Sequence, residues 1–386
     1  MSNGLSVAVD GHMKTRRTRW SWGGAVGTAV LAVLLVSRGI SACNGATRLI
    51  PVKHVMHYTD GRPALRYRVA KIHDLGVVLR YGGGPGNCDE FGARDVWVYK
   101  AGATYYMHYD GAGPEGWLCC QATSHDLLHW KKEGPILQLG KPGRADSASA
   151  SYGTTYFNGR NWYMFYLGTS NATPPPDRIP STPYVTMLAK SRWPGGPWVK
   201  QHGVVPFQPR PNTYYFATAS PGPIVKRGRD YLMFFSAAAF AHGRLLRTLG
   251  LARTRNINSK WTIDRKPLFP PTEQIENASL YYQRADKTWF LFTNHVGLNG
   301  GGEYDDAIWV FWSRHLTHWN PAHGAIVLDG RTCTWSHQRI GLPSVIKVGH
   351  RLMVFYDAPR GGGTGNMRCD VGLAELRLPL VVPGRR

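Results

Sequence analysis

One aromatic-rich segment occurs five times along this chain of 386 residues. Its copies read YYMHY, WYMFY, YLMFF, WFLFT and RLMVF, and each has the composition of a buried β-strand. Their central residues lie 57, 69, 58 and 62 residues apart, at Met107, Met164, Met233, Leu291 and Met353. A strand that returns about every 60 residues indicates a chain built from repeated structural units.

A second marker follows the first four copies of the strand. The phrases ATSHDLLHW, LAKSRWPGGPW, LARTRNINSKW and VFWSRHLTHW each end in Trp, and DVGLAEL begins the same phrase after the fifth copy. Gly, Asn and Asp mark turns between the strands, as in YFNGRNWY. Four short antiparallel strands per unit, repeated five times, predict an all-β fold, a five-bladed β-propeller over residues 81–386.

Composition agrees with an all-β chain and adds an excess of positive charge. The sequence contains 12% aromatic residues, 45 Gly and 26 Pro, while long helical patterns are scarce. Its formal net charge of +22 favours an anionic partner such as an acidic polysaccharide. No helix-turn-helix, zinc-finger or RNA-binding signature accompanies the charge, so nucleic acid is not the expected partner.

Residues 1–43 have the pattern of an export signal. A basic stretch, MKTRRTRW, precedes fourteen largely apolar residues from Gly23 to Val36. That run is shorter than the roughly 20 residues of a membrane-spanning helix. ISAC, which ends at Cys43, resembles a bacterial lipoprotein cleavage box. We expect a signal peptide or a membrane or lipid anchor at 1–43, an N-terminal extension at 44–80, and an exported protein that is periplasmic, membrane-anchored or extracellular.

Export would permit disulfide bonds among the six cysteines. None of them has the Cys or His spacing of a zinc site. The sequence also contains no other convincing cluster of metal ligands. We therefore expect neither a metal site nor a cofactor.

Acidic residues precede the repeated strands in three units. Asp95 lies twelve residues before Met107, Asp146 lies eighteen before Met164, and Glu276 lies fifteen before Leu291. In a propeller these positions fall at the starts of the innermost strands, where different blades converge on one mouth of the channel. The pattern predicts that the three carboxylates meet in one pocket.

This layout resembles the five-bladed propeller glycoside hydrolases of families 43, 32, 68 and 130. RDVWVYKAGATYYM is similar to the opening of family 43, and the resemblance covers nearly all of the chain after about residue 80. It implies that Asp95 is the general base or nucleophile, that Asp146 tunes the pKa of the acid and orients it, and that Glu276 is the general acid. The family usually carries its acid in an EGP-like phrase of the third blade, where this chain has Ser220–Pro223, SPGP.

Four further residues are candidates for binding substrate. Asp89 and Glu90 lie in a Gly-rich approach to the first unit, and His337 and Arg339 precede the last repeated strand. Glu303, in GGGEYDD, is an alternative acid. The expected partner is a carbohydrate, neutral or acidic, and the expected state is a monomer.

The sequence thus leaves two functions of different classes. The first is hydrolysis of an oligo- or polysaccharide by the Asp/Asp/Glu set. The second is a non-catalytic propeller that binds a glycan or another polyanion, because the third unit lacks the usual acid. A nucleic-acid binder ranks last, since it rests on charge alone.

Overall fold

The computed structural model describes residues 45–53, 64–241, 243–299 and 302–384. Within these ranges the chain is all-β, as predicted, and its helical elements are two 3₁₀ turns, η1 (Pro85–Asn87) and η2 (Pro271–Glu273). No helix in this part of the chain is long and apolar enough to cross a membrane. The export signal expected at 1–43 lies outside the described residues.

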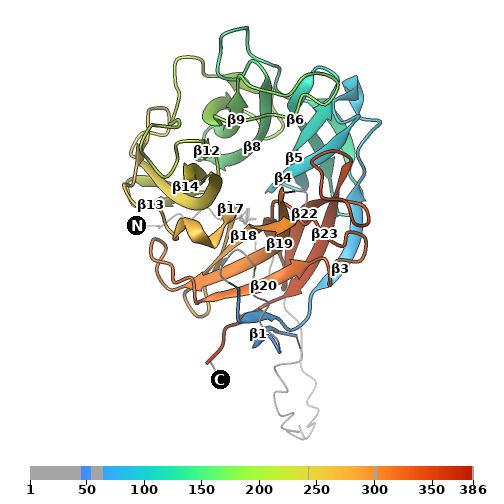
Figure 1. Cartoon of the computed structure of the whole chain (residues 1–386), viewed down its shortest axis with the longest axis vertical. Coiled ribbons are helices and arrows are strands. Elements are labelled where there is room, and N and C mark those ends of the chain that lie inside the picture. Colours follow the sequence, from blue (N-terminus) through green and yellow to red (C-terminus); the bar gives the residue numbers. More distant parts are fainter. Residues whose placement is uncertain (1–44, 54–63, 242, 300–301, 385–386) are drawn as a thin grey trace, which may run out of the picture.

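Consecutive strands pair antiparallel in runs, each of which meanders from the inside of the molecule outward. The first run contains β4 (Gly92–Ala101), β5 (Thr104–Gly113), β6 (Gly116–Ser124) and β7 (Lys131–Pro135). The second run contains β8 (Ser149–Phe157), β9 (Trp162–Thr169), β10 (Val185–Ser191) and β11 (Val199–Lys200). Figure 1 shows these runs in cyan and green, side by side.

The third run begins with an interrupted strand. β12 (Thr218–Ser220) and β13 (Ile224–Arg227) both pair with β14 (Asp230–Ala241), which is followed by β15 (Arg244–Thr254) and β16 (Thr262–Ile263). The interruption contains Pro221 and Pro223, which have no N–H to donate to a ladder. The fourth run is continuous: β17 (Ile275–Gln283), β18 (Thr288–Asn299), β19 (Gly302–Ser313) and β20 (Gly324–Asp329).

The fifth run combines the two ends of the chain. β21 (Ser344–Val348), β22 (Arg351–Pro359) and β23 (Cys369–Arg377) pair in order, and the outermost partner of β23 is β3 (His73–Leu79). In Figure 1 the blue β3 therefore lies beside the red β23. β3, from the N-terminal part of the chain, thus completes the fifth run.

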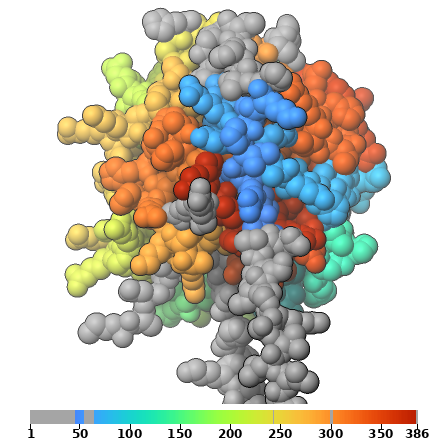
Figure 2. All heavy atoms as spheres, turned by 90° about the horizontal axis from the view of Figure 1, so that it is seen from below, coloured from blue at the N-terminus to red at the C-terminus, as the bar shows by residue number. Residues whose placement is uncertain are grey.

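Other strands near the termini cover the outer edge of the fourth run. β2 (Tyr67–Val69) pairs with β20, and β1 (Thr47–Pro51) joins β2 to β24 (Leu380–Val381). Figure 2 shows this blue segment running across the surface between orange and red ones. The segment 44–80 therefore supplies strands to sheets whose other members come from 81–386.

The hydrophobic core lies between neighbouring runs and follows them in a circle. Five buried clusters each join two runs, and the last cluster joins the fifth run to the first. Packing therefore closes the arrangement although each sheet is open. Representative pairs, from the first–second cluster to the fifth–first, are Tyr99 with Met164, Phe165 with Phe235, Phe234 with Leu291, Phe292 with Val354, and Phe355 with Met107.

The five repeated segments of the sequence are the second strands of the runs. They form β5, β9, β14, β18 and β22, each between two partners. Their central residues are all buried, at 0% exposure for four and 7% for Met353. The predicted equivalence of these strands is confirmed, and their aromatic content reflects packing between runs.

Candidate active site

The first strands of the runs line two cavities at opposite ends. One cavity, of about 390 Å³, lies where β4, β8, β12 and β17 begin or run through their first residues, and we call it the carboxylate cavity. The other, of about 520 Å³, lies where β4, β8 and β17 end and includes β13 and β21, and we call it the aromatic cavity. Asp and Glu residues line the carboxylate cavity, and no described Asp or Glu lines the aromatic cavity.

Asp95 and Glu276 both line the carboxylate cavity, although 180 positions of sequence separate them. Each lies where the pairing of its strand is irregular. The register of β4 against β5 shifts between Arg94 and Trp97, and that of β17 against β18 shifts after Glu276. A β-bulge of this kind re-aims side chains and is common next to active sites.

Each bulge leaves a backbone N–H group without a partner in the strand ladder. A side chain of the preceding run accepts a hydrogen bond from that group. The amide of Asp95, which has φ +51°, donates to Asp357 Oδ1 of β22 at 3.2 Å. The amide of Asn277, which has φ +58°, donates to Ser236 Oγ of β14 at 2.8 Å. A polar side chain of the neighbouring run therefore fixes each bulge by a hydrogen bond.

The second run contains the same arrangement of a bulge and a side-chain acceptor. Pairing of β8 with β9 is interrupted between Ala150 and Gly153, and the amide of Tyr152 within that gap donates to the carboxylate of Asp110 on β5. Asp110 is 3% exposed and lines the carboxylate cavity. Burial raises the pKa of Asp110 well above its usual range, and the nearby charge of Asp95 raises it further.

Glu276 belongs to a cluster of charges on one side of the cavity. Arg247 Nη1 lies 3.0 Å from Glu276 Oε2, and Arg247 Nη2 lies 3.5 Å from Glu303 Oε2. Gln274 donates to the other oxygen of Glu303 at 3.1 Å. The guanidinium thus bridges the two carboxylates and holds Glu276 in place.

Asp95 belongs to a second cluster that Asp305 organises. Arg94 Nη2 lies 3.2 Å from Asp95 Oδ1 and 4.0 Å from Asp305 Oδ2. Arg339 binds the same Asp305 oxygen at 3.0 Å, and Asn294 donates to its other oxygen at 2.8 Å. Two arginines thus hold Asp305 between them, and one of them also orients Asp95.

These surroundings raise the pKa values of two carboxyls. Burial raises the pKa of Glu276, the charge of Arg247 opposes that rise, and the charges of Asp305 and Asp95 add to it. Burial likewise raises the pKa of Asp357 to about 6, against the lowering effect of Arg339. A raised pKa favours the protonated form, which a general acid needs.

The third run contributes hydroxyls where the resembling family usually has its acid. Thr218 and Ser220 of β12 line the carboxylate cavity. β12 itself reads Thr-Ala-Ser, so the strand brings no carboxylate. The acid function, if present, must come from another run.

The expectation that Asp146 converges with Asp95 and Glu276 is not met. Asp146 does not line the carboxylate cavity. Its carboxylate is fully buried and accepts hydrogen bonds from Tyr166 at 2.8 Å and from Lys200 at 2.6 Å. Although burial alone would raise its pKa, Lys200 and Tyr166 lower it. Asp146 precedes β8 by three positions, and it anchors the approach to that strand.

The other predicted binding residues divide in a similar way. Arg339 lines the cavity, whereas Asp89 is buried beside Lys132 at 2.5 Å and Tyr109 at 3.2 Å. Glu90 and His337 are exposed and do not line it. Of the four residues, Arg339 alone reaches the cavity with its guanidinium.

The sequence contains a sign of two further carboxylates at this site. Asp110 and Asp357 end the repeated phrases HYD and FYD, each immediately after a buried aromatic residue. A carboxylate inside a buried strand requires a partner, which is here the freed amide of the next run. Arg247 and Asp305 gave no comparable sign, because Glu276 and Arg339, their partners, lie 29 and 34 positions away in the sequence.

A disulfide lies close to this site. Cys88 and Cys120 are bonded, with Cα atoms 6.8 Å apart, and Cys120 is adjacent to the free, buried Cys119 that pairs with Asp110 across the strands. The bond joins the approach to β4 with β6. Among the described residues, no group of three or more His, Cys, Asp or Glu side chains is arranged to hold a metal ion.

No protein-family model matches the sequence, and a search of curated proteins finds no matching relative. Solved structures do match. One titled as a glycoside hydrolase has a TM-score of 0.63 and 15% identity, with 81% of this chain and 94% of that chain covered. A thermostable family-43 glycoside hydrolase has a TM-score of 0.56 and 13% identity, with 78% and 92% covered.

An α-L-arabinanase of Cellvibrio cellulosa, solved with arabinohexaose, has a TM-score of 0.54 and 13% identity, with 74% of this chain and 92% of that chain covered. At such identities the likeness is one of fold. The suspected resemblance to propeller glycoside hydrolases is confirmed at that level. The matches extend over most of this chain and nearly the whole of each solved structure.

Proposed function

We propose that this protein is a glycoside hydrolase whose runs are the blades of a five-bladed propeller, each with four strands. The circular order of the hydrophobic clusters supports five blades, with β12 and β13 together as the innermost strand of the third. The carboxylate cavity is the active site in this proposal. The observation that carries most weight for this proposal is that Asp95 and Glu276, from different blades, line one cavity.

Glu276 is the proposed general acid. Glycosidic cleavage needs a protonated carboxyl beside the leaving oxygen and an ionised carboxylate on the opposite face of the sugar. Burial and the charges of Asp305 and Asp95 raise the pKa of Glu276, which favours its protonated form. Glu276 would give its proton to the glycosidic oxygen as the bond to the anomeric carbon breaks.

Asp95 is the proposed base or nucleophile. Arg94 lies 3.2 Å from it and holds its carboxylate in the cavity. Ionised Asp95 would either take a proton from the attacking water or attack the anomeric carbon itself. The first course inverts the anomeric configuration and the second retains it.

Asp305 takes the tuning role that the resemblance implied for Asp146, and Asp110 holds the amide of Tyr152 at the cavity wall. The charge of Asp305 raises the pKa of Glu276, whereas Asp146 pairs with Lys200 outside the cavity. Both are positioning residues in this scheme. The substrate is an oligo- or polysaccharide, and arabinofuranosides are the first class to test because the arabinanase of similar fold was solved with arabinohexaose.

Export completes the proposal. The basic and apolar pattern of residues 1–43 supports it, and so does the Cys88–Cys120 disulfide, because such bonds persist in oxidising compartments. Fractionation of the native host's cells, with an antibody to the protein, should find it outside the cytoplasm. Recovery of the full-length chain from the cytosol would contradict export.

The deciding experiment for the activity is a screen of purified protein against aryl glycosides and polysaccharides, beginning with arabinofuranosides. The wild type should release sugar, and Asp95→Asn and Glu276→Gln should each abolish most of that release. Asp146→Asn is the matched control, because it neutralises a carboxylate outside the cavity. Equal loss in all three variants would contradict the assigned roles.

A non-catalytic glycan-binding propeller is the second candidate. Ser220 favours it, since a hydroxyl occupies the blade on which the resembling family usually carries its acid. Under this alternative the wild type binds oligosaccharides but releases no sugar from any substrate. Binding that Asp95→Asn leaves intact, together with no release, would support it over hydrolysis.

A further inference from the structure

The aromatic cavity differs from the carboxylate cavity in both shape and charge. Eight aromatic residues line it: Trp97, Tyr99, Tyr105, Tyr156, Phe157, Trp162, Tyr281 and Tyr282. Its cations are Lys100, Arg284, Lys347 and His350 when protonated, all exposed, and its lining contains no Asp or Glu. A mouth of this composition attracts anions rather than cations.

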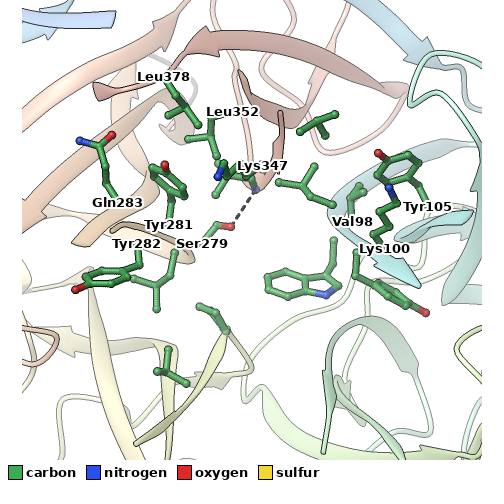
Figure 3. A pocket seen from close by; sticks show the side chains of 18 of the residues that line it. Val98, Lys100, Tyr105, Ser279, Tyr281, Tyr282, Gln283, Lys347, Leu352 and Leu378 are labelled. Carbon is green, nitrogen blue, oxygen red and sulfur yellow. Dashed lines mark hydrogen bonds between the residues drawn. The ribbon is translucent and has the colours of Figure 1, made fainter. Parts of the chain in front are cut away.

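The cations come from three of the five runs. Lys100 belongs to the first run, Arg284 follows β17 of the fourth, and Lys347 and His350 belong to the fifth. Figure 3 shows Lys100 and Tyr105 on one side, Tyr281 and Tyr282 on the opposite side, and Lys347 between them. A ligand in the middle of the cavity would therefore meet positive charge from more than one direction.

These charges are not neutralised within the described part of the chain. No salt bridge there involves Lys100, Arg284, Lys347 or His350, and Lys100 Nζ lies 4.8 Å from the ring centroid of Tyr105. The acid closest in sequence to Arg284 is Asp286, which does not line the cavity and accepts a hydrogen bond from Gln283 at 3.0 Å. The ammonium groups remain available to an external anion.

Hydrogen bonds between neighbouring strands hold the wall of the aromatic cavity in place. Ser279 Oγ of β17 accepts the amide of Val345 of β21 at 3.0 Å, as the dashed line in Figure 3 shows. Ser344 Oγ of β21 accepts the amide of Val98 of β4 at 2.9 Å. Buried serines thus join three first strands side by side, so the backbones that carry these rings and lysines keep fixed relative positions.

We propose that the aromatic cavity is a second glycan site, which binds an oligosaccharide carrying carboxylate groups. The partly exposed rings of Trp97, Phe157 and Tyr282 can pack on the apolar C–H faces of sugars, while the other five rings are buried between runs and shape the wall. Lys100 and Lys347 would bind the carboxylates by charge-assisted hydrogen bonds. The site goes beyond the proposed function, because binding here requires neither Asp95 nor Glu276.

The test measures binding of an oligogalacturonate and of a neutral arabino-oligosaccharide of equal length, by calorimetry. It uses the full chain carrying Glu276→Gln, so that hydrolysis cannot consume the probe. Lys100→Glu combined with Lys347→Glu should weaken oligogalacturonate binding at least about tenfold, because two charge-assisted contacts are lost and repulsion replaces them. The same pair of substitutions should change the affinity for the neutral probe, which the carboxylate cavity can also bind, less than about twofold.

Arg192→Glu combined with Arg314→Glu is the matched control. Both arginines are exposed and neither lines the cavity, so the pair changes the net charge equally. It should alter the affinity less than about twofold. Equal losses in the two double variants would overturn the proposal, because the binding would then follow overall charge.

Two other results would also overturn it. One is an equal loss of affinity for the neutral and acidic probes when Lys100 and Lys347 are both replaced by Glu. The other is tighter binding of a single-stranded oligonucleotide of the same charge with the same dependence on Lys100 and Lys347. If the glutamate variants fail to fold, Lys100→Met with Lys347→Met gives the same comparison without repulsion. Absence of hydrolysis in the wild type leaves this result unaffected, so the two proposals fail separately.

Discussion

The two cavities show how one set of strands can present two different chemistries. Carboxylates and arginines line the cavity at the beginnings of β4, β8 and β17, whereas aromatic rings and lysines line the cavity at their ends. The strand pairing differs as well. β4 is irregular against β5 between Arg94 and Trp97 and regular from there to Ala101.

That difference in pairing explains the difference in chemistry. A regular ladder satisfies its own amides, so side chains at that end need only pack. Each bulge leaves an amide that a buried acceptor must satisfy, and Asp110, Ser236 and Asp357 are those acceptors. Buried carboxylates in turn require arginines. The polar network at the carboxylate cavity therefore follows from the bulges that aim its proposed catalytic residues.

The largest expected effect of a substitution is on turnover at the carboxylate cavity. Asp95→Asn and Glu276→Gln keep side-chain shape and remove proton transfer, so turnover should fall by roughly 10²–10⁴ while folding survives. Steady-state kinetics on a substrate with a poor leaving group would measure this. Full activity of Glu276→Gln on that substrate would instead point to Glu303 as the acid.

Next in size is the effect of Asp357 on stability. Asp357→Ala leaves the amide of Asp95 without its acceptor and removes a carboxylate 3.6 Å from the buried Arg339. The free energy of unfolding should fall by about 2–3 kcal/mol, measured by denaturant titration. Asp230→Ala is the control, because it breaks an exposed pair with Arg255 worth under about 1 kcal/mol. Similar losses in both would contradict the role of Asp357.

A third effect concerns the pH dependence of turnover. Glu276 must be protonated to act, so turnover should fall as the pH rises through its pKa. The charge of Asp305 raises that pKa and the charge of Arg247 lowers it. Asp305→Asn should therefore move the alkaline limb to lower pH, and Arg247→Met should move it to higher pH. A pH–rate profile of kcat measures both, and shifts in the same direction would contradict the assignment of Glu276.

Repetition made the fold predictable from the sequence, and the same repetition limited prediction of the site. The five aromatic phrases predicted equivalent buried strands, since burial depends on residues within each phrase. The meeting of Asp95 and Glu276 was predictable because each precedes a repeated strand and lies near the start of the first strand of its run. Asp146 occupies a similar place but turns away, because Lys200 and Tyr166 hold it elsewhere. Its partners lie 54 and 20 positions away, and no local pattern announces them.

The smallest expected effect tests whether the aromatic cavity uses its rings as well as its charges. Tyr282 is partly exposed, lines the cavity and lies 4.5 Å, centroid to centroid, from Trp289. Tyr282→Ala removes one ring face and leaves every lysine, so oligogalacturonate binding should weaken about three- to tenfold, in line with the loss of one aromatic contact. Hydrolysis should not change, because the carboxylate cavity lies at the other ends of the strands. Calorimetry at two salt concentrations separates the contributions, since added salt screens the lysines and leaves ring packing intact. If Tyr282→Ala binds as tightly as the parent at both concentrations, the ring contributes nothing and the site recognises charge alone.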